Sequence, residues 1–102
     1  MQSFGAVIRN ARESRGFLLR QVAVLSKIDK SILSKIEKGC RKPTREHISK
    51  LSEVIEIDKE ILMIQYLSDK IVSEIVSDEC ASKALKVAEK KIKIIKAKGI
   101  LK

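Results

Sequence analysis

Residues 28–44 decide the fold, and they read IDKSILSKIEKGCRKPT. Asp29 is a favoured residue type for capping the start of a helix, and Gly39 is a favoured type just after a helix ends. The apolar side chains between them recur at helical spacing. The apolar face of the expected helix consists of Ile32 or Leu33, followed by Ile36.

A second short helix is expected directly before this one, over residues 19–26. Its buried side is expected to comprise Val22, Ala23 and Leu25. The link Ser26-Lys27-Ile28-Asp29 between the two helices is three or four residues long. A link of that length is typical of the turn in a helix-turn-helix motif.

The segments on either side also carry helix signals. Upstream, Ser3 can cap a helix that ends at Gly16, and its apolar stripe is formed by Phe4, Val7, Ile8 and Ala11. Downstream, Thr44 can cap a helix whose apolar face is formed by Ile48, Leu51, Ser52 and Ile55.

Two amphipathic helices are expected in the remaining sequence, over residues 58–76 and 79–97. Asp78 can cap the second of them, and Gly99 can end it. The chain has one proline, four glycines and 3% aromatic residues. So few turn residues favour packed helices over a β-sandwich, and we expect an all-α fold with an aliphatic core.

Charge is distributed unevenly along the chain, which has a net charge of +9. Residues 1–57 carry 12 Lys/Arg against 6 Asp/Glu, residues 58–78 carry 2 against 5, and residues 79–102 carry 8 against 2. Two basic regions flanking an acidic segment point to a polyanionic partner. The alternative is that the lysines only keep the helices soluble.

Several other classes of protein are excluded by the residues present. Cys40 and Cys80 have no CxxC partner and the sole histidine, His47, stands seven residues from Cys40, so no zinc pattern fits. The sequence offers no catalytic grouping and no glycine-rich phosphate loop, so we expect neither an enzyme nor a cofactor. No uncharged run approaches the length of a membrane span, and the N-terminal region is charged from Arg9 onward. We expect free thiols and a cytoplasmic protein.

Four segments together resemble the XRE, or lambda-repressor-like, helix-turn-helix family: Arg15-Gly16-Phe17, Val22-Ala23, residues 28–39 and Arg41-Lys42-Pro43-Thr44. The ending Ile-Glu-x-Gly-x-x-x-Pro is the most diagnostic part. The resemblance covers about residues 4–63. It implies a five-helix DNA-binding domain, assigned to residues 1–64, and a sequence-specific transcription regulator that represses by occupying an operator.

The family resemblance and helix geometry together suggest a DNA-reading surface. The N-terminal half of a recognition helix reaches base edges in the major groove, and here its polar residues are Lys30, Ser31, Ser34 and Lys35. Ile32 would touch a thymine methyl or pack internally. The basic loop that follows suits DNA phosphates, with main-chain N–H groups approachable because of its glycine. Its residues are Lys38, Gly39, Cys40, Arg41 and Lys42.

Three positions depart from the pattern that is usual in the family. Leu18 and Leu19 stand where the family usually has Thr-Gln or Ser-Gln, so the hydroxyl cap and the phosphate-binding amide are missing. Arg20 and Gln21 are expected to contact the phosphates from the next turn. Lys27 occupies a turn position usually held by glycine, which costs energy if its φ is positive.

The resemblance also implies an ion pair between Arg12 of the first helix and Glu37 of the recognition helix. Such a pair would orient the recognition helix.

Residues 65–102 are expected to extend the family domain and to mediate a homodimer. The alternative is that they enlarge the core of a monomer. The apolar residues assigned to the interface are Leu67, Ile71, Val72, Ile75, Leu85, Ala88, Ile92 and Ile95. The last helix also has a lysine-rich face, which is a solvated surface, an extension of the DNA footprint or a membrane-surface contact. It consists of Lys83, Lys86, Lys90, Lys91, Lys93, Lys96, Lys98 and Lys102.

Two alternatives to a simple repressor remain. One is an antitoxin with a toxin partner, or a controller of a restriction–modification locus, within the same family. The other, of a different class, is a protein-interaction or membrane-surface adaptor without specific DNA binding. Salt-dependent binding to a preferred duplex distinguishes a regulator from an adaptor.

Overall fold

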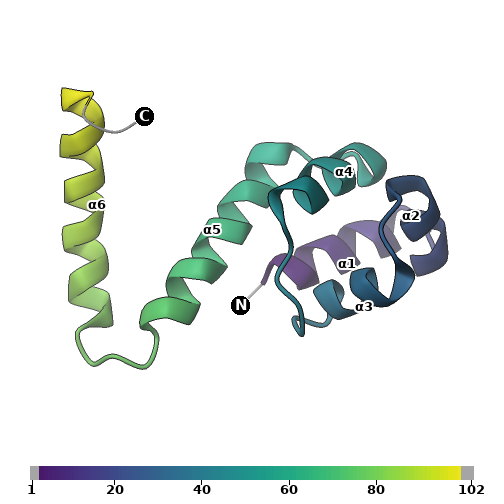
Figure 1. The fold of residues 1–102 in the computed structure, drawn as a ribbon, viewed down its shortest axis with the longest axis horizontal. Coiled ribbons are helices and arrows are strands. Elements are labelled where there is room, and N and C mark those ends of the chain that lie inside the picture. Colours follow the sequence, from purple (N-terminus) through teal and green to yellow (C-terminus); the bar gives the residue numbers. More distant parts are fainter. Residues whose placement is uncertain (1–2, 100–102) are drawn as a thin grey trace. The chain divides into compact units, whose positions relative to one another are not determined.

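The computed structural model describes residues 3–99 and consists, within that range, of six α-helices and no strand (Figure 1). In chain order the helices are α1 (Phe4–Ser14), α2 (Leu19–Ser26), α3 (Lys30–Glu37), α4 (Arg45–Ile55), α5 (Lys59–Ile75) and α6 (Ala81–Lys98). The all-α fold predicted from the sequence is confirmed.

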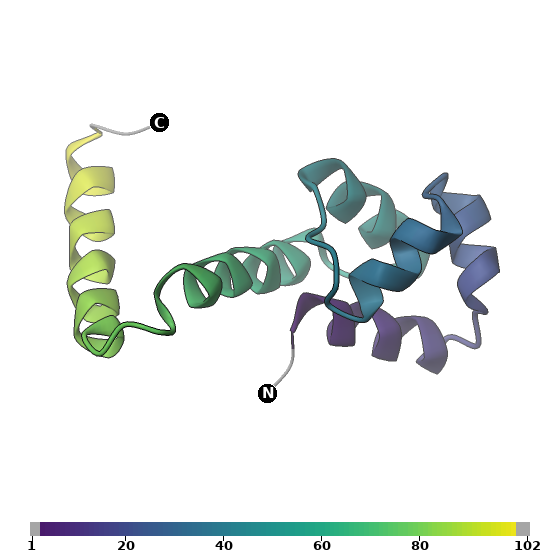
Figure 2. The same cartoon turned by 60° about the horizontal axis from the view of Figure 1, so that its bottom comes forward.

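The chain divides into two compact units, and the boundary between them falls at Lys70 and Ile71, inside α5. The first unit contains α1 to α4 and most of α5, and the second contains the end of α5 and α6. α5 is drawn as one continuous helix through this boundary (Figure 2). The domain boundary at residues 64 and 65 stays a prediction.

An aliphatic core holds the first unit together. α1 and α2 each pack against α3 and against α4, and Leu62 adds one fully buried side chain from α5. The buried apolar residues are Phe4, Ile8, Val22, Ala23, Ile28, Leu33, Ile36, Ile48, Leu51, Ile55 and Leu62. The apolar stripes expected for the first, third and fourth helices therefore do face the core.

Side-chain caps fix where these helices begin, as the sequence predicts. The Ser3 Oγ accepts the Ala6 N–H at 3.3 Å, and the Asp29 Oδ1 accepts the Ser31 N–H at 2.9 Å. At α4 the cap is reciprocal: Thr44 Oγ1 accepts the His47 N–H, and His47 Nδ1 accepts the Thr44 N–H, both at 3.1 Å. Each cap satisfies a backbone N–H that the helix itself leaves unpaired.

α5 is attached to the first unit by polar contacts as well as by Leu62. The Asp69 Oδ2 accepts the N–H of Phe4 at 2.8 Å, which places a carboxylate at the N-terminus of α1, where the helix dipole favours negative charge. The Tyr66 ring has two cations over it, with Arg45 at 5.8 Å and Lys70 at 5.3 Å from the ring centroid. The segment before Ile71 is thus part of the first unit.

Two local expectations are wrong. Leu25 is 58% exposed, because Ser26 instead completes the buried side of α2 with Val22 and Ala23. The buried Ser26 hydroxyl donates to the Val22 carbonyl at 2.6 Å, so it is satisfied without water. α6 begins at Ala81 after an N-cap residue that makes no side-chain cap bond, and Asp78 instead accepts the Cys80 N–H at 2.9 Å in the preceding turn.

Gly5 permits the closest approach between α1 and α3. It is buried, and a Cβ built at this position meets the backbone carbonyl oxygens of Ile36 and Glu37. Backbone atoms cannot move aside as a flexible side chain can, so only glycine fits without displacing one helix. The apolar stripe predicted for this helix, Phe4, Val7, Ile8 and Ala11, does not include Gly5.

We expect Gly5→Ala to lower the free energy of unfolding by about 2 kcal/mol or more, although alanine is the better helix former, because the added methyl group overpacks a helix contact. Urea unfolding followed by circular dichroism measures the change. Asn10→Ala, at an exposed position of the same helix, is the control and should not destabilise. Equal stability of Gly5→Ala and the parent chain would contradict the close approach.

Lys27 occupies the left-handed region, with φ 57° and ψ 33°, at the C-cap of α2. The cost expected from the sequence for a non-glycine residue here therefore applies. We expect Lys27→Gly to raise the free energy of unfolding by about 1 kcal/mol, since glycine adopts this conformation without a Cβ clash.

The control for this prediction is Lys27→Ala, which removes the same charge but keeps a Cβ in the left-handed conformation. It should bring no gain in urea unfolding. If alanine stabilises the protein as much as glycine does, the effect comes from charge and not from the backbone.

Candidate nucleic-acid interface

Packing fixes which face of α3 is turned outward. Leu33 and Ile36 are 0% and 1% exposed. At about 100° per residue, Ser31, Ser34 and Lys35 lie on the side of α3 opposite to this buried pair. Ser31 and Lys35 are exposed and Ser34 is half-buried, while Lys30, at the edge of the outer face, is exposed. The structure thus brings the four predicted base readers to one polar surface.

The position of Ile32 was left open by the sequence. It is half-buried and packs against the core. Of the two roles expected for Ile32, contact with a thymine methyl or internal packing, its position fits internal packing.

The loop after α3 is held by its own main chain. The N–H groups of Cys40 and Arg41 both donate to the Lys35 carbonyl, at 2.9 and 3.3 Å, and the Gly39 N–H donates to the Ile36 carbonyl at 3.1 Å. Gly39 has φ +78°, as is usual for a glycine that ends a helix. The expectation that the glycine leaves these amides approachable is therefore wrong, because they close the end of α3.

The side chains of the loop remain available. Lys38, Cys40, Arg41 and Lys42 are exposed, and no disulfide involves Cys40. The three cations among them form no ion pair with any residue in the described range 3–99. Contact with an anion here would use these ammonium and guanidinium groups in place of main-chain N–H groups.

The start of α2 compensates only in part for its missing hydroxyl cap. Leu18 makes no side-chain cap bond, but the Gln21 Oε1 accepts the Leu18 N–H at 2.8 Å. This uses the oxygen of the amide and leaves its NH₂ group to donate elsewhere. The neighbouring Arg20 is exposed. Gln21 can therefore cap the helix and still contact a phosphate.

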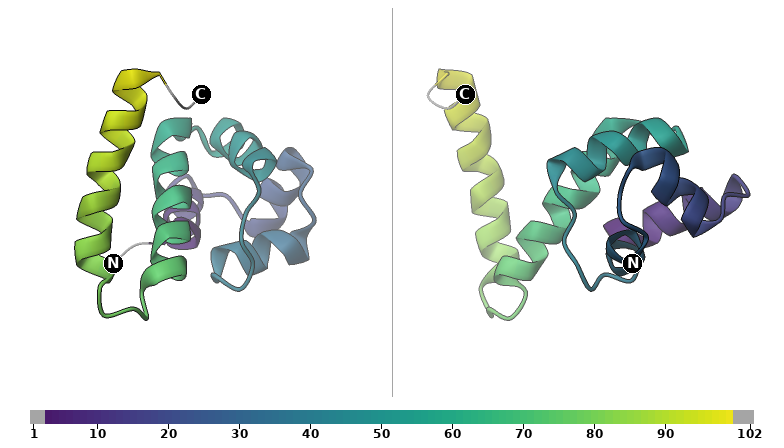
Figure 3. Two further views of the ribbon diagram at one scale, coloured as in Figure 1. Left: turned by 60° about the vertical axis from the view of Figure 1, so that its left-hand side comes forward. Right: turned by 45° about the vertical axis from the view of Figure 1, so that its right-hand side comes forward.

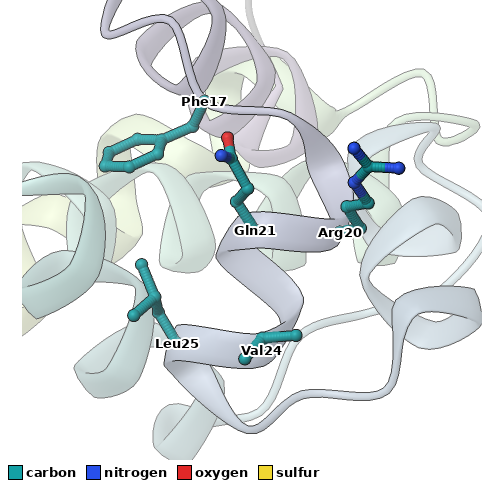
Figure 4. A pocket seen from close by; sticks show the side chains of 5 residues that line it. All are labelled: Phe17, Arg20, Gln21, Val24 and Leu25. Atoms are coloured by element: carbon teal, nitrogen blue, oxygen red, sulfur yellow. The ribbon is translucent and has the colours of Figure 1, made fainter.

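An open depression lies beside these two residues and is lined by Phe17, Arg20, Gln21, Val24 and Leu25 (Figure 4). Val24 is 76% exposed. The lining is mainly apolar, and it holds no cluster of charged or nucleophilic side chains. The residues that line this depression therefore do not indicate a catalytic site.

An ion pair between Arg12 and Glu37 holds α3 against α1, as the family resemblance implies. Arg12 Nε lies 2.8 Å from Glu37 Oε2 and Arg12 Nη2 lies 3.0 Å from Oε1, so the pair is bidentate. Arg12 Nη1 also donates to the Phe17 carbonyl at 2.9 Å. The side chains are only 12% and 6% exposed. The hydrogen bond to Glu37 raises the pKa of Arg12 despite the opposing effect of burial.

His47 lies close to the basic loop. Partial burial is the main reason that its pKa is lowered, and the positive charges of Arg41 and Lys50 act in the same direction, against the carboxylate of Glu46. The neutral imidazole is also the form that can accept the Thr44 N–H at Nδ1. His47 is thus a capping residue at neutral pH.

Within residues 3–99 there is no group of three or more His, Cys, Asp or Glu side chains that could hold a metal ion. No helix in the same range is long and apolar enough to cross a membrane.

Comparison with known proteins identifies the domain. The family model described as "Helix-turn-helix" matches residues 8–62, which include every residue of the predicted DNA surface. The HTH-type transcriptional regulator SlrR of Bacillus subtilis is 35% identical over 71 residues, which cover 63% of this chain and 47% of SlrR. No solved structure gives a significant match.

Two mycobacterial proteins give similar matches. An uncharacterized HTH-type transcriptional regulator of Mycobacterium tuberculosis is 31% identical over 61 residues, covering 60% of this chain and 44% of that protein. The transcriptional regulator ClgR of the same species is 32% identical over 60 residues, covering 59% and 54%. The chain thus spans about half the length of the curated relatives it matches.

The matched residues 8–62 make up more than half of the chain and run from α1 into α5. They contain both helices of the motif, the turn at Lys27 and the Glu37 partner of Arg12. The chain therefore belongs to the XRE, or lambda-repressor-like, type of the helix-turn-helix family.

Proposed function

We propose that the chain is a sequence-specific transcription regulator in which α3 enters the major groove of double-stranded DNA. The observation that carries the proposal is the contrast between two sets of cations. Arg12 and Arg15 are already engaged in intramolecular ion pairs, Arg12 with Glu37 in a largely buried pair and Arg15 with Glu56 at the surface. The cations on α3 and on the loop after it are exposed and pair with no described residue.

The residues divide into two roles in this proposal. Lys30, Ser31, Ser34 and Lys35 read base edges. Lys and Ser are suited to this, since Lys can donate to guanine O6 and N7 and Ser can donate or accept. The second group, which positions the protein on the phosphate backbone, comprises Arg20, Gln21, Lys38, Arg41 and Lys42. Gly39 and Cys40 support that group by shaping the loop.

Repression by operator occupancy is the mode of action we propose, with residues 1–64 as the DNA-binding domain, acting in the cytoplasm. A regulator of this kind is usually two-fold symmetric, with two half-sites about one DNA turn apart. We therefore propose a homodimer formed by residues 65–102. In its favour, many apolar side chains there are exposed, among them Leu67, Ile71, Val72, Leu85 and Ile92.

We expect Lys35→Ala and Arg41→Ala to weaken DNA binding in different ways. A preferred duplex is first selected from a randomised pool, and binding is then titrated at several salt concentrations. Lys35→Ala should relax the preference at one base pair, at a cost of about 1–3 kcal/mol on the preferred duplex. Arg41→Ala should weaken all duplexes alike and reduce the salt slope by about 0.9 for one lost phosphate contact.

Lys59→Ala is the control, because it removes the same charge from an exposed position on α5, outside the proposed surface. It should leave both the base preference and the salt slope nearly unchanged. Sequence-blind losses of equal size from Lys35→Ala and Arg41→Ala would contradict base reading by Lys35. Failure of the pool to yield any preferred duplex would overturn the proposed function.

A further inference from the structure

The last helix has an apolar stripe that its own unit leaves exposed. No residue of α6 is buried, and Leu85 and Ile92 are 46% and 53% exposed. At about 100° per residue, one side of the helix gathers Ala81, Ala84, Leu85, Ala88, Ile92 and Ile95. Figure 3 shows α6 as one uninterrupted helix, so this stripe runs along its length. Helices in proteins gain most of their stability by packing an apolar face, and a partner on this stripe would supply that packing.

The rest of the α6 surface is strongly basic. Residues 81–98 carry seven lysines and one glutamate. The glutamate, Glu89, pairs with Lys93 at 3.2 Å. The other six lysines form no ion pair with any residue of the described range 3–99. The helix therefore combines an apolar face with a net charge of +6.

Lysines border the stripe on both sides. Around the helix axis, Lys91 lies next to Ala84 at one border and Lys96 lies next to Leu85 at the other. Both lysines are exposed. A lysine at the border of an apolar face can keep its ammonium group in water while its methylene chain covers apolar surface. The opposite face of α6 is also basic and carries Lys83, Lys86, Lys90 and Lys93.

Charge decides which partner fits this combination. A second α6 would bring its own seven lysines against these. DNA phosphates would match the lysines but leave Leu85 and Ile92 in water. The surface of an anionic bilayer offers both counterparts, because its acyl region accepts an apolar stripe and its headgroups attract lysines. A protein partner would need carboxylates fixed at both borders, whereas anionic lipids diffuse laterally and can gather there.

We propose that α6 lies flat on an anionic membrane surface, with the stripe toward the acyl chains and the border lysines at the headgroups. Helices that are apolar on one face and lysine-rich on the other bind in the plane of the interface. Because α6 contains no aromatic residue, its attachment depends on charge and is reversible. The inference goes beyond the proposed function. Lipid would cover Leu85 and Ile92, and Leu67, Ile71 and Val72 would remain for the proposed dimer.

Tryptophan fluorescence of the full chain tests which face meets the lipid. The chain contains no tryptophan, so a single introduced tryptophan is the sole reporter. Ile92→Trp and Ile94→Trp are a matched pair, since the two positions are 53% and 54% exposed but only Ile92 lies on the stripe.

The probe is a vesicle of equal parts phosphatidylcholine and phosphatidylglycerol. With it, the emission of Ile92→Trp should move to shorter wavelength and be quenched by brominated acyl chains, because the ring enters the apolar region. Ile94→Trp should show neither effect. Equal responses of the two variants, or no response of Ile92→Trp, would overturn the inference.

Flotation with two kinds of vesicle tests the dependence on lipid charge. Binding of the parent chain to the mixed vesicles should exceed binding to phosphatidylcholine alone by roughly tenfold or more, since several lysines lie near the surface. Equal binding to both kinds of vesicle would contradict an anionic partner.

The cations of the first unit could also adsorb to anionic vesicles, and a second matched pair separates that effect. Ile92→Glu and Ile94→Glu change the charge of α6 equally. Ile92→Glu should weaken binding to the mixed vesicles by roughly tenfold or more, because it places a carboxylate in the apolar stripe, and Ile94→Glu should weaken it much less. Equal losses would assign the binding to charge alone and overturn the inference.

The outcome for DNA is independent of this one. A chain that selects a preferred duplex, yet shows no response of Ile92→Trp to the mixed vesicles, would overturn the membrane contact and leave the DNA-binding role standing. A chain that shows the response but selects no duplex would do the reverse.

Discussion

The guanidinium of Arg12 is the group on which the geometry of the motif depends. With five donors fixed in a plane, it joins the carboxylate of Glu37 at the end of α3 to the main chain at Phe17 just before α2. A lysine could not do this, because its ammonium group is a point charge. The planar guanidinium of arginine instead presents two parallel N–H groups that match the two oxygens of a carboxylate. The net stabilisation from such a desolvated pair is small. Its contribution is to set the direction of α3 relative to α1, and the contact at Gly5 sets the distance.

Much of the first unit was predictable because its signals are local. Caps at Ser3, Asp29 and Thr44 follow from residue types whose side chains bond to nearby backbone, and the core stripes follow from helical periodicity. The Arg12–Glu37 pair was predictable only from family resemblance, because no local rule joins residues 25 positions apart. A glycine inside a predicted helix, such as Gly5, is only a weak sequence signal. Its reason, the close approach of the α3 backbone, is evident only from the structure.

Two of the errors have a common physical origin. Of the adjacent residues Leu25 and Ser26, hydrophobicity predicted that Leu25 is buried, but Ser26 is the buried one. Burying the serine costs little free energy, because its hydroxyl donates a hydrogen bond to the Val22 carbonyl. The loop amides were expected to be free, but a helix end must satisfy its own carbonyls first. Both cases turn on where backbone hydrogen bonds go, which a pattern of apolar and polar residues does not encode. The predicted DNA-reading surface depends on side chains on α3, whose exposure follows directly from the burial of Leu33 and Ile36.

The hydrogen bonds at the Lys35 carbonyl have a thermodynamic consequence. One oxygen anchors the N–H groups of both Cys40 and Arg41, so the backbone that carries a proposed base reader and the backbone that carries a proposed phosphate contact are joined in a single rigid segment. The conformational entropy of placing those two backbones relative to each other is therefore lost on folding. Only side-chain freedom remains to be lost when the two cations meet an anion, and that smaller loss leaves more of the contact energy as affinity.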